Sequence, residues 1–374
     1  MHELLLRNAR IIDPASGRDE VNDIAFADGR VADIGPGLEA GEVRDLSGHI
    51  VSPGLIDLHT HIYWGGTSLG VDPVAYAREA GATTLVDAGS AGAGNFHGFR
   101  AHVIEPSAPR ILAYLNISFA GIFGFSDEVM VGECGDFRLL EPEVCLAVAE
   151  RHRDLIVGIK VRVGLEASEG RGVAPLDLAL EVADELGLPV MCHLDHPPPS
   201  RLEVVSRLRP GDVMTHCFRP FPGAPARARD GAVREEIIAA RERGVLFDIG
   251  HGAGSFGFVT AEAMLEAGFM PDCISSDVHT MSIRGPAYNL MVTLSKFLAL
   301  GMPLNDVIAA GSWGPARAIG KTELGTLEVG ARGDATVMKL ASGEFSFMDV
   351  KGLERTSSEQ LELEGMILDG RWWS

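Results

Sequence analysis

The sequence of 374 residues predicts an α/β fold: a (β/α)8 TIM barrel with a small β-sandwich domain formed by both chain ends. Two observations support this prediction. Between residues 54 and 320, eight apolar strand patterns alternate with helical patterns, which is typical of a parallel barrel. Before and after this region, the chain consists of short strand patterns separated by turns. We therefore expect residues 1–53 and 321–374 to form the β-sandwich and residues 54–320 to form the barrel.

The first fifty residues contain five strand candidates and no helical period. Turn residues at Pro14–Gly17 and Pro36–Gly37 separate some of them. The candidates are Glu3–Asn8, Arg10–Asp13, Asp23–Ala27, Arg30–Ile34 and His49–Val51. The segment from Leu324 to Met338 has the same strand-and-turn character, so we expect it to pair with the N-terminal strands.

The barrel region gives eight strands and the helices between them. The predicted strands are Leu55–His61, Thr84–Ala88, Ile111–Asn116, Ile156–Val163, Val190–His193, Val213–His216, Leu246–Ile249 and Cys273–Asp277. The predicted helices are Val74–Ala80, Pro142–Arg151, Pro175–Leu186, Leu202–Leu208, Val233–Arg243, Ala261–Ala267 and Ala287–Leu300. In such barrels the active site lies at the C-terminal ends of the strands, so polar residues at those ends are the candidates for chemistry.

Composition narrows the classes of partner. The net charge of −20 argues against binding to nucleic acid or to an anionic membrane surface, both of which favour basic proteins. The sequence offers neither a secretory signal nor an apolar run long enough to span a bilayer. Its five cysteines are odd in number and scattered, which favours reduced thiols. We therefore expect a cytoplasmic protein that acts on a small molecule.

Two histidines close the first barrel strand. His59 and His61 are two positions apart on an apolar run, so they lie on one face of the strand and can bind a metal together. A single histidine at a strand end is more often structural, and a single aspartate there is more often a helix cap. The prediction depends on the whole set of six, in which four further residues lie on or end other strands: Lys160, His193, His216 and Asp277.

Lys160 is the unusual member of this set. Alternation places Ile159 and Val161 toward the outer helices and Lys160 toward the barrel interior. Burial and nearby positive charge both favour a neutral amine, which can add carbon dioxide to give an anionic carbamate able to bridge two metals. The alternative is a buried lysine paired with a carboxylate such as Asp277.

These motifs resemble the amidohydrolase superfamily, in its two-metal, carboxylated-lysine branch. The resemblance covers the full length, from the entry segment Pro53–His61 to the closing segment Gly325–Thr336. The motifs around the candidate ligands look most like a dihydroorotase-like subgroup that includes deacetylases: His59–Tyr63, Gly158–Arg162, Cys192–His196 and Ser275–His279.

The resemblance implies roles for all six residues and two zinc ions. His59 and His61 would bind the first ion, His193 and His216 the second, carboxylated Lys160 would bridge them, and Asp277 would bind the first ion and carry a proton as the catalytic residue. It also implies that the protein can form a homo-oligomer. The reaction expected is hydrolysis of an amide or ester carbonyl by metal-activated water.

Two departures from known relatives narrow the substrate. Dihydroorotases carry an arginine where this chain has Tyr63, and nucleobase deaminases carry His-x-x-Glu where it has His193–His196. The resemblance to the subgroup that includes deacetylases implies deacetylation of small N-acetyl or O-acetyl α-substituted carboxylates. The alternative is a cyclic-amide hydrolase of the dihydroorotase or hydantoinase kind. A non-catalytic barrel scaffold is a remote alternative, because no ligand is missing.

Five further residues are candidate substrate contacts. Arg162 follows Lys160 on the same face and could bind a carboxylate bidentately, although a structural ion pair is an equal alternative. Arg284, on the loop after strand eight, could serve instead. His251 ends strand seven and could bond a substrate oxygen, or orient a ligand. Tyr114 and Asn116 end strand three and could line the acyl pocket.

Overall fold

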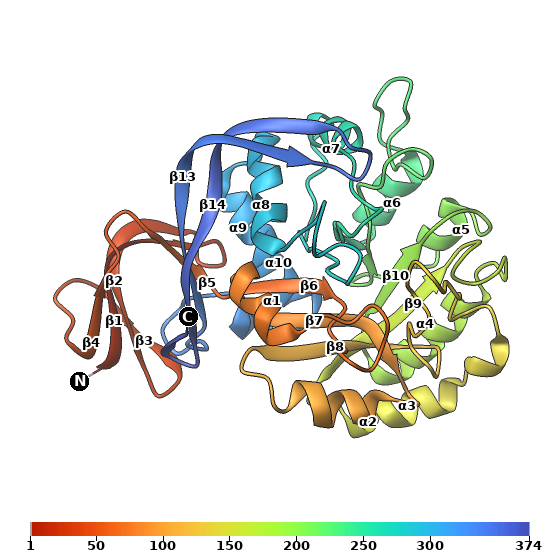
Figure 1. Ribbon diagram of the computed structural model, residues 1–374, viewed down its shortest axis with the longest axis horizontal. Coiled ribbons are helices and arrows are strands. Elements are labelled where there is room, and N and C mark those ends of the chain that lie inside the picture. Colours follow the sequence, from red (N-terminus) through yellow and green to blue (C-terminus); the bar gives the residue numbers. More distant parts are fainter. Residues whose placement is uncertain (1, 374) are drawn as a thin grey trace.

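Strands from both ends of the chain form one eight-stranded sheet in the computed structural model, which describes residues 2–373 (Figure 1). Its order is β15-β14-β13-β5-β1-β2-β3, and β4 also pairs with β1. The strands are β1 (His2–Asp13), β2 (Arg18–Ala27), β3 (Arg30–Ile34), β4 (Ala40–Asp45), β5 (Ile50–Pro53), β13 (Ala335–Met348), β14 (Glu354–Leu368) and β15 (Arg371–Trp373). The predicted pairing of the two ends occurs between β5 and β13, where Pro53 lies opposite Ala335. A separate β-sandwich domain stays a prediction.

This sheet differs from the sequence prediction in several places, including β14 and β15, for which no strand was predicted, and β2, which begins at Arg18 rather than Asp23. The first two predicted strands are the single strand β1, in which the register shifts between Leu6 and Ala9 and Asn8 has a φ of 59°. A β-bulge therefore replaces the predicted break. β4 was not predicted, because the polar segment Ala40–Asp45 lacks an apolar alternation.

The second sheet is parallel and curled. Its seven strands, in the order β12-β11-β10-β9-β8-β7-β6, follow the predicted sequence of units. They are β6 (Leu55–Thr60), β7 (Ala82–Gly92), β8 (Arg110–Asn116), β9 (Ile156–Val163), β10 (Val190–Leu194), β11 (Val213–Met214) and β12 (Leu246–Phe247). The predicted eighth strand, Cys273–Asp277, is not a regular strand. Single bridges join Cys273 to Asp248 and Val278 to Thr60, so this segment links the two edges of the sheet.

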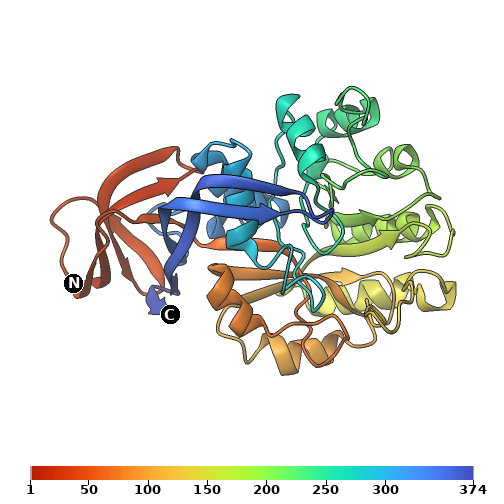
Figure 2. The same cartoon turned by 45° about the horizontal axis from the view of Figure 1, so that its top comes forward.

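Helices pack around the curled sheet (Figures 1 and 2). They are α1 (Pro73–Ala80), α2 (Phe96–Phe99), α3 (Pro142–Arg151), α4 (Ala174–Leu186), α5 (Arg201–Val205), α6 (Glu235–Glu242), α7 (Phe258–Glu266), α8 (Leu290–Ala299), α9 (Leu304–Gly311) and α10 (Trp313–Ala318), with a π-helix at Arg100–Ile104 and 3₁₀ turns at Phe137–Leu139 and Thr322–Leu324. All seven predicted helices have counterparts, whereas α2, α9 and α10 were not predicted. The β13–β14 hairpin extends over α8, where the backbone of Leu361 donates to the Ser295 hydroxyl at 3.0 Å.

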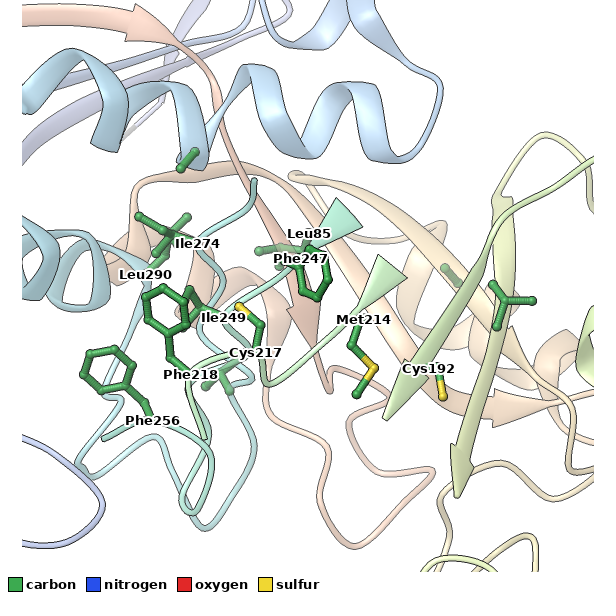
Figure 3. Packing of buried hydrophobic residues seen from close by; sticks show 14 of the residues in the cluster. Leu85, Cys192, Met214, Cys217, Phe218, Phe247, Ile249, Phe256, Ile274 and Leu290 are labelled. Atoms are coloured by element: carbon green, nitrogen blue, oxygen red, sulfur yellow. The ribbon is translucent and has the colours of Figure 1, made fainter. Parts of the chain in front are cut away.

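Alternation along the strands separates two apolar layers. Ile159, Val161 and Val163 belong to the main core between sheet and helices, as predicted. Figure 3 shows part of this core, where Met214 and Phe247 lie on the strands β11 and β12. A smaller cluster fills the inside of the sheet. The opposite phase of β9 turns Lys160 to the inside, which brings its amine to the site described below.

None of the helices within residues 2–373 has the length and apolar character that a membrane crossing requires. All five cysteines are buried and free.

Candidate metal centre

The six predicted metal ligands come together in one small cavity at the C-terminal ends of the parallel strands. The cavity has a volume of about 30 Å³. Its lining includes all six: His59, His61, Lys160, His193, His216 and Asp277. Arg162, His279 and the apolar residues Leu69, Ile122 and Phe125 complete the lining. Residues distant in the sequence therefore meet as the strand order predicts.

The closest grouping consists of His59, His61 and Asp277. Their ligand atoms all lie within 4.8 Å of one another. Asp277 Oδ1 is 3.4 Å from His59 Nε2 and 3.2 Å from His61 Nε2. Two atoms bound tetrahedrally to one zinc ion at about 2.0–2.1 Å lie about 3.3–3.4 Å apart, so this spacing fits a shared cation.

The other three candidates adjoin this group. Lys160 Nζ is 3.4 Å from His59 Nε2. The rings of His193 and His216 meet edge to face with their centroids 4.4 Å apart. His193 Nε2 is buried and has no hydrogen-bond partner among residues 2–373. A buried polar atom without a partner is costly and needs an explanation, and the donor set around it is one that binds zinc.

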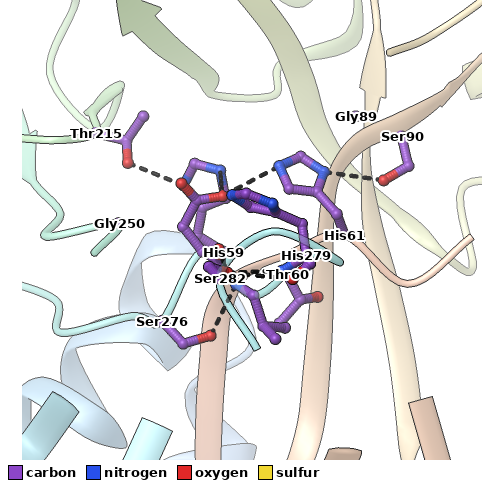
Figure 4. A network of polar contacts seen from close by, with 12 residues as sticks. His59, Thr60, His61, Gly89, Ser90, Thr215, Gly250, Ser276, His279 and Ser282 are labelled. Atoms are coloured by element: carbon purple, nitrogen blue, oxygen red, sulfur yellow. Dashed lines mark hydrogen bonds and ion pairs between the residues drawn. The ribbon is translucent and has the colours of Figure 1, made fainter. Parts of the chain in front are cut away.

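Hydrogen bonds from neighbouring strands orient the imidazoles. Figure 4 shows His59 Nδ1 against the Thr215 hydroxyl, at 2.9 Å, and His61 Nδ1 against the Ser90 hydroxyl, also at 2.9 Å. The Thr215 hydroxyl in turn donates to Asp248 Oδ2 at 2.7 Å. Because the Nδ1 atoms are engaged, the Nε2 atoms of His59 and His61 face Asp277, as metal ligation requires.

Two of the candidate ligands have a strained backbone. His216 and Asp277 have φ angles of 62° and 48°, a region that residues other than glycine rarely adopt. Hydrogen bonds hold both: His216 Nδ1 donates to the Gly250 carbonyl at 2.7 Å, and the Ser282 hydroxyl donates to the Asp277 carbonyl at 3.0 Å. Such strain is typical of functional sites.

The protonation states suit metal binding. Burial lowers the pKa of His61 to about 3 and holds the pKa values of His59, His193 and His216 well below 6.5, so the imidazoles are neutral. Burial also lowers the pKa of Lys160 to about 8, against the opposing charge of Asp277. Burial raises the pKa of Asp277 to about 6, against the positive charges around it.

Of the two predicted arginines, only Arg162 reaches the cavity. Arg162 Nη1 is 3.3 Å from Oε2 of Glu133, a fully buried carboxyl, and its guanidinium lies 5.1 Å from the centre of the Phe125 ring. The ion-pair alternative is therefore realised. Arg284 is exposed and does not line the cavity. The loop after Asp277 carries its side chain outward, which removes the geometric basis for its predicted contact with substrate.

The remaining predicted substrate contacts do not line the cavity either. Both ring nitrogens of His251 are engaged, Nδ1 with the Gly252 carbonyl at 2.9 Å and Nε2 with Lys296 Nζ at 2.7 Å. Tyr114 packs in the cluster inside the sheet. The Asn116 amide donates to the Gly89 carbonyl at 3.1 Å. These contacts are structural, so their positions give no support to the predicted roles in substrate binding.

Loops close the mouth of the cavity. The Ser68 hydroxyl donates to the carbonyls of Phe123 and Phe125, at 3.2 and 3.1 Å, and accepts from the Phe125 amide at 3.0 Å. The amide of Thr280 donates to the carbonyl of Leu69 at 3.0 Å. These contacts bring Leu69 and Phe125 over the histidines, and they explain why the cavity is small.

Three features of the site were not predicted from the sequence. They are Glu133, the hydrogen-bond chain from His59 through Thr215 to Asp248, and Arg219. Arg219 lies three residues after His216, and both line a neighbouring cavity of about 220 Å³. Arg219 belongs to no recognisable motif and lies outside the regular strands, so only the folded chain reveals it.

Two curated relatives cover most of the chain. A deacetylase of Agrobacterium fabrum is 37% identical over 354 residues, covering 93% of this chain and 86% of the relative. A deacetylase of Brucella anthropi is 39% identical over 342 residues, covering 89% and 83%. No protein-family model matches the chain.

Two solved structures share the whole fold. The crystal structure of a dihydroorotase is 34% identical, with a TM-score of 0.91, and covers 100% of this chain and 98% of its own. The crystal structure of an adenine deaminase is 28% identical, with a TM-score of 0.93, and covers 100% of both chains. With the metal-ligand constellation described above, these similarities establish that the chain is a hydrolytic enzyme of the amidohydrolase superfamily.

Proposed function

We propose that this protein is a zinc-dependent deacetylase acting on small N-acetyl or O-acetyl α-substituted carboxylates. The observation that carries the proposal is the convergence of six ligand-type side chains, with neutral imidazoles, in one cavity. The relatives named deacetylase support the reaction, because each is similar over more than four fifths of its length.

We further propose two zinc ions, held by His59, His61 and Asp277 on one side and by His193 and His216 on the other. When bound, such ions would polarise the substrate carbonyl and lower the pKa of water toward neutrality.

Lys160 would contribute a bridging carbamate. Its neutral amine adds carbon dioxide, so that a nitrogen–carbon bond forms and one amine proton leaves to solvent. The lowered pKa of Lys160, about 8, favours this step because it increases the fraction of neutral amine near neutral pH. The carbamate would also replace a positive charge with a negative one beside the histidines.

Asp277 is the proposed proton carrier. One carboxylate oxygen accepts the proton of the attacking water, and the carboxyl then gives it to the leaving nitrogen or oxygen as the carbonyl bond breaks. Leu69, Ile122 and Phe125 keep bulk water from the reacting atoms.

A cyclic-amide hydrolase is the second candidate, favoured by the similarity to a dihydroorotase structure. The position of Tyr63 weighs against it. The ring of Tyr63 packs 4.8 Å from that of Phe99 and its hydroxyl donates to the Asn95 carbonyl, so it cannot replace a substrate-binding arginine. A non-catalytic scaffold is disfavoured, because all six ligand types are present. Deamination lacks the expected glutamate, since the chain reads His193-Leu194-Asp195-His196.

A substrate panel tests the proposal. The purified enzyme, loaded with zinc and bicarbonate, would be incubated with N-acetyl amino acids, O-acetyl 2-hydroxy acids, dihydroorotate and hydantoins. We expect acetate release from acetylated acids and two zinc ions per chain by elemental analysis. Turnover of the cyclic amides alone would favour the second candidate, and a metal-free protein under these conditions would refute both.

A further inference from the structure

Arg219 is a positive group that lines the cavity of about 220 Å³ next to the site, and the proposed mechanism does not use it. Both terminal nitrogens of its guanidinium form hydrogen bonds that hold the side chain in place. Nη1 donates to the carbonyl of Leu194, which ends β10, at 2.8 Å, and Nη2 donates to the hydroxyl of Ser255 at 3.2 Å. Its backbone amide donates to the carbonyl of His216 at 3.2 Å. Two of its five side-chain N–H groups are therefore engaged, and three are free for another partner.

The charge of Arg219 is not paired. Both of its side-chain hydrogen bonds go to neutral oxygens, and within residues 2–373 no carboxylate oxygen lies within 4.0 Å of it. Asp195 is nearby, but its carboxylate accepts backbone hydrogen bonds from Ala167 and Glu166, at 2.8 and 3.4 Å. Arg219 is largely buried, and burial lowers its pKa. A desolvated cation is stabilised by an anion, and the charges of Asp195, Asp277 and Glu166 offset only part of the effect of burial on Arg219.

Two other arginines that line these cavities do have a carboxylate partner. Arg162 is paired with Glu133 at 3.3 Å, and Arg201 with Glu236 at 3.6 Å. Arg219 lines a cavity together with His216, which also lines the ligand cavity, and its backbone amide bonds the His216 carbonyl. Its side chain therefore lies on the side of the site next to His216.

The space beside Arg219 is also suitable. The cavity at the candidate ligands has a volume of about 30 Å³, which is little more than the reacting group needs. A second cavity, of about 220 Å³, is lined by Arg219. His216 lines both cavities. Met214, Ile237 and Phe247, which belong to the core between sheet and helices, also line this larger cavity. Its chemistry matches an acid with an apolar group next to its carboxylate.

We propose that Arg219, rather than Arg162 or Arg284, binds the carboxylate of the substrate and selects acids over their neutral derivatives. The free N–H groups of Arg219 would form a charge-assisted pair with both carboxylate oxygens. This inference rests on the proposed deacetylase function, which it makes more specific.

The test compares an acetylated acid with its methyl ester, which has the same scissile acetyl group and no charge. We expect the wild type to prefer the acid. Arg219→Met should lower kcat/KM for the acid by about 100-fold, mainly through KM, and leave the ester nearly unchanged, because only the acid loses a charged hydrogen-bond pair. Arg229→Met is the matched control, since its side chain is 88% exposed on the same loop and should leave both substrates unchanged.

Calorimetry gives a second measurement that does not depend on turnover. The deacetylated acid should bind zinc-loaded wild type and Arg229→Met, and should bind Arg219→Met at least about 30-fold more weakly. Equal losses on acid and ester would assign Arg219 a structural role and overturn the inference, as would a collapse of acid preference in Arg162→Met but not in Arg219→Met. If the wild type releases no acetate, the proposed function fails, and calorimetry with 2-hydroxy and 2-amino acids still decides whether Arg219 binds carboxylates.

Discussion

The substitution Thr215→Val tests the hydrogen-bond chain behind the metal centre. The Thr215 hydroxyl donates its one hydrogen to Asp248 Oδ2 at 2.7 Å, so it accepts from His59 Nδ1 at 2.9 Å. Without the hydroxyl, the His59 ring loses the partner that fixes its tautomer, since Asp248 itself is 3.6 Å from His59 Nδ1. Valine has nearly the same shape, so the change removes the polar link and little packing.

We expect zinc affinity to fall by about 10- to 100-fold, as for other partners of metal-bound histidines. This corresponds to about 1.4–2.8 kcal/mol. The loss should not be larger, because Asp248 keeps its hydrogen bond from the Ser275 hydroxyl at 2.6 Å and His59 stays enclosed by its neighbours.

Competition with a chromophoric zinc chelator measures this affinity directly. Thr293→Val is the matched control, because this buried hydroxyl only donates to the Asn289 carbonyl one turn earlier in its own helix. Circular dichroism and thermal unfolding establish that both variants fold. If Thr215→Val bound zinc as tightly as the wild type, within twofold, the chain through Asp248 would not orient His59 and the reasoning would be refuted.

Three further predictions concern charged groups inside the fold. Asp277→Asn should lower kcat for acetate release by at least about 100-fold, because the amide cannot carry the proton; an active variant with unchanged kcat would contradict this role. Lys160→Met should bind fewer zinc ions per chain by elemental analysis and lose the dependence of loading on bicarbonate, whereas equal loading would argue against a carbamate. Burial lowers the pKa of Lys296 from 10.5 to about 7, so above pH 7 the folded state holds fewer protons than the unfolded chain and stability rises with pH toward 10.5. Urea unfolding at pH 6.5 and 9 should therefore give a larger rise in the free energy of unfolding for wild type than for Lys296→Met, and equal rises would show that Lys296 does not titrate in this window.

The convergence of the candidate metal ligands could be predicted in part because regular strands fix the direction of side chains. On β6, a separation of two residues puts His59 and His61 on one face. On β9, the apolar residues Ile159 and Val161 face the outer helices, so Lys160 must face inward. Parallel strands in one curled sheet then bring these residues together, whereas His216 and Asp277 lie outside the regular strands, with φ angles of 62° and 48°.

The lining beyond the ligands could not be predicted in this way. Arg284 and His251 follow strand ends in the sequence, but the chain there is irregular and alternation no longer applies. His251 turns to Lys296, whose ammonium also donates to the carbonyls of Pro286 and Met348 at 2.7 and 2.8 Å. The hairpin that contributes Met348 is distant in the sequence, so no local pattern contains this interaction.

Arg219 is a residue near the site that strand alternation could not have predicted. The backbone of His216 leaves the extended region at a φ of 62°, and the turn that follows brings the amide of Arg219 back to the His216 carbonyl. The guanidinium then spans from the end of β10 to Ser255, on the loop after β12. A strand continued to residue 219 would have carried this charge away from the mouth. The residue that we expect to select the substrate therefore lies where the strand alternation ends, and alternation is the pattern from which the candidate metal ligands were predicted.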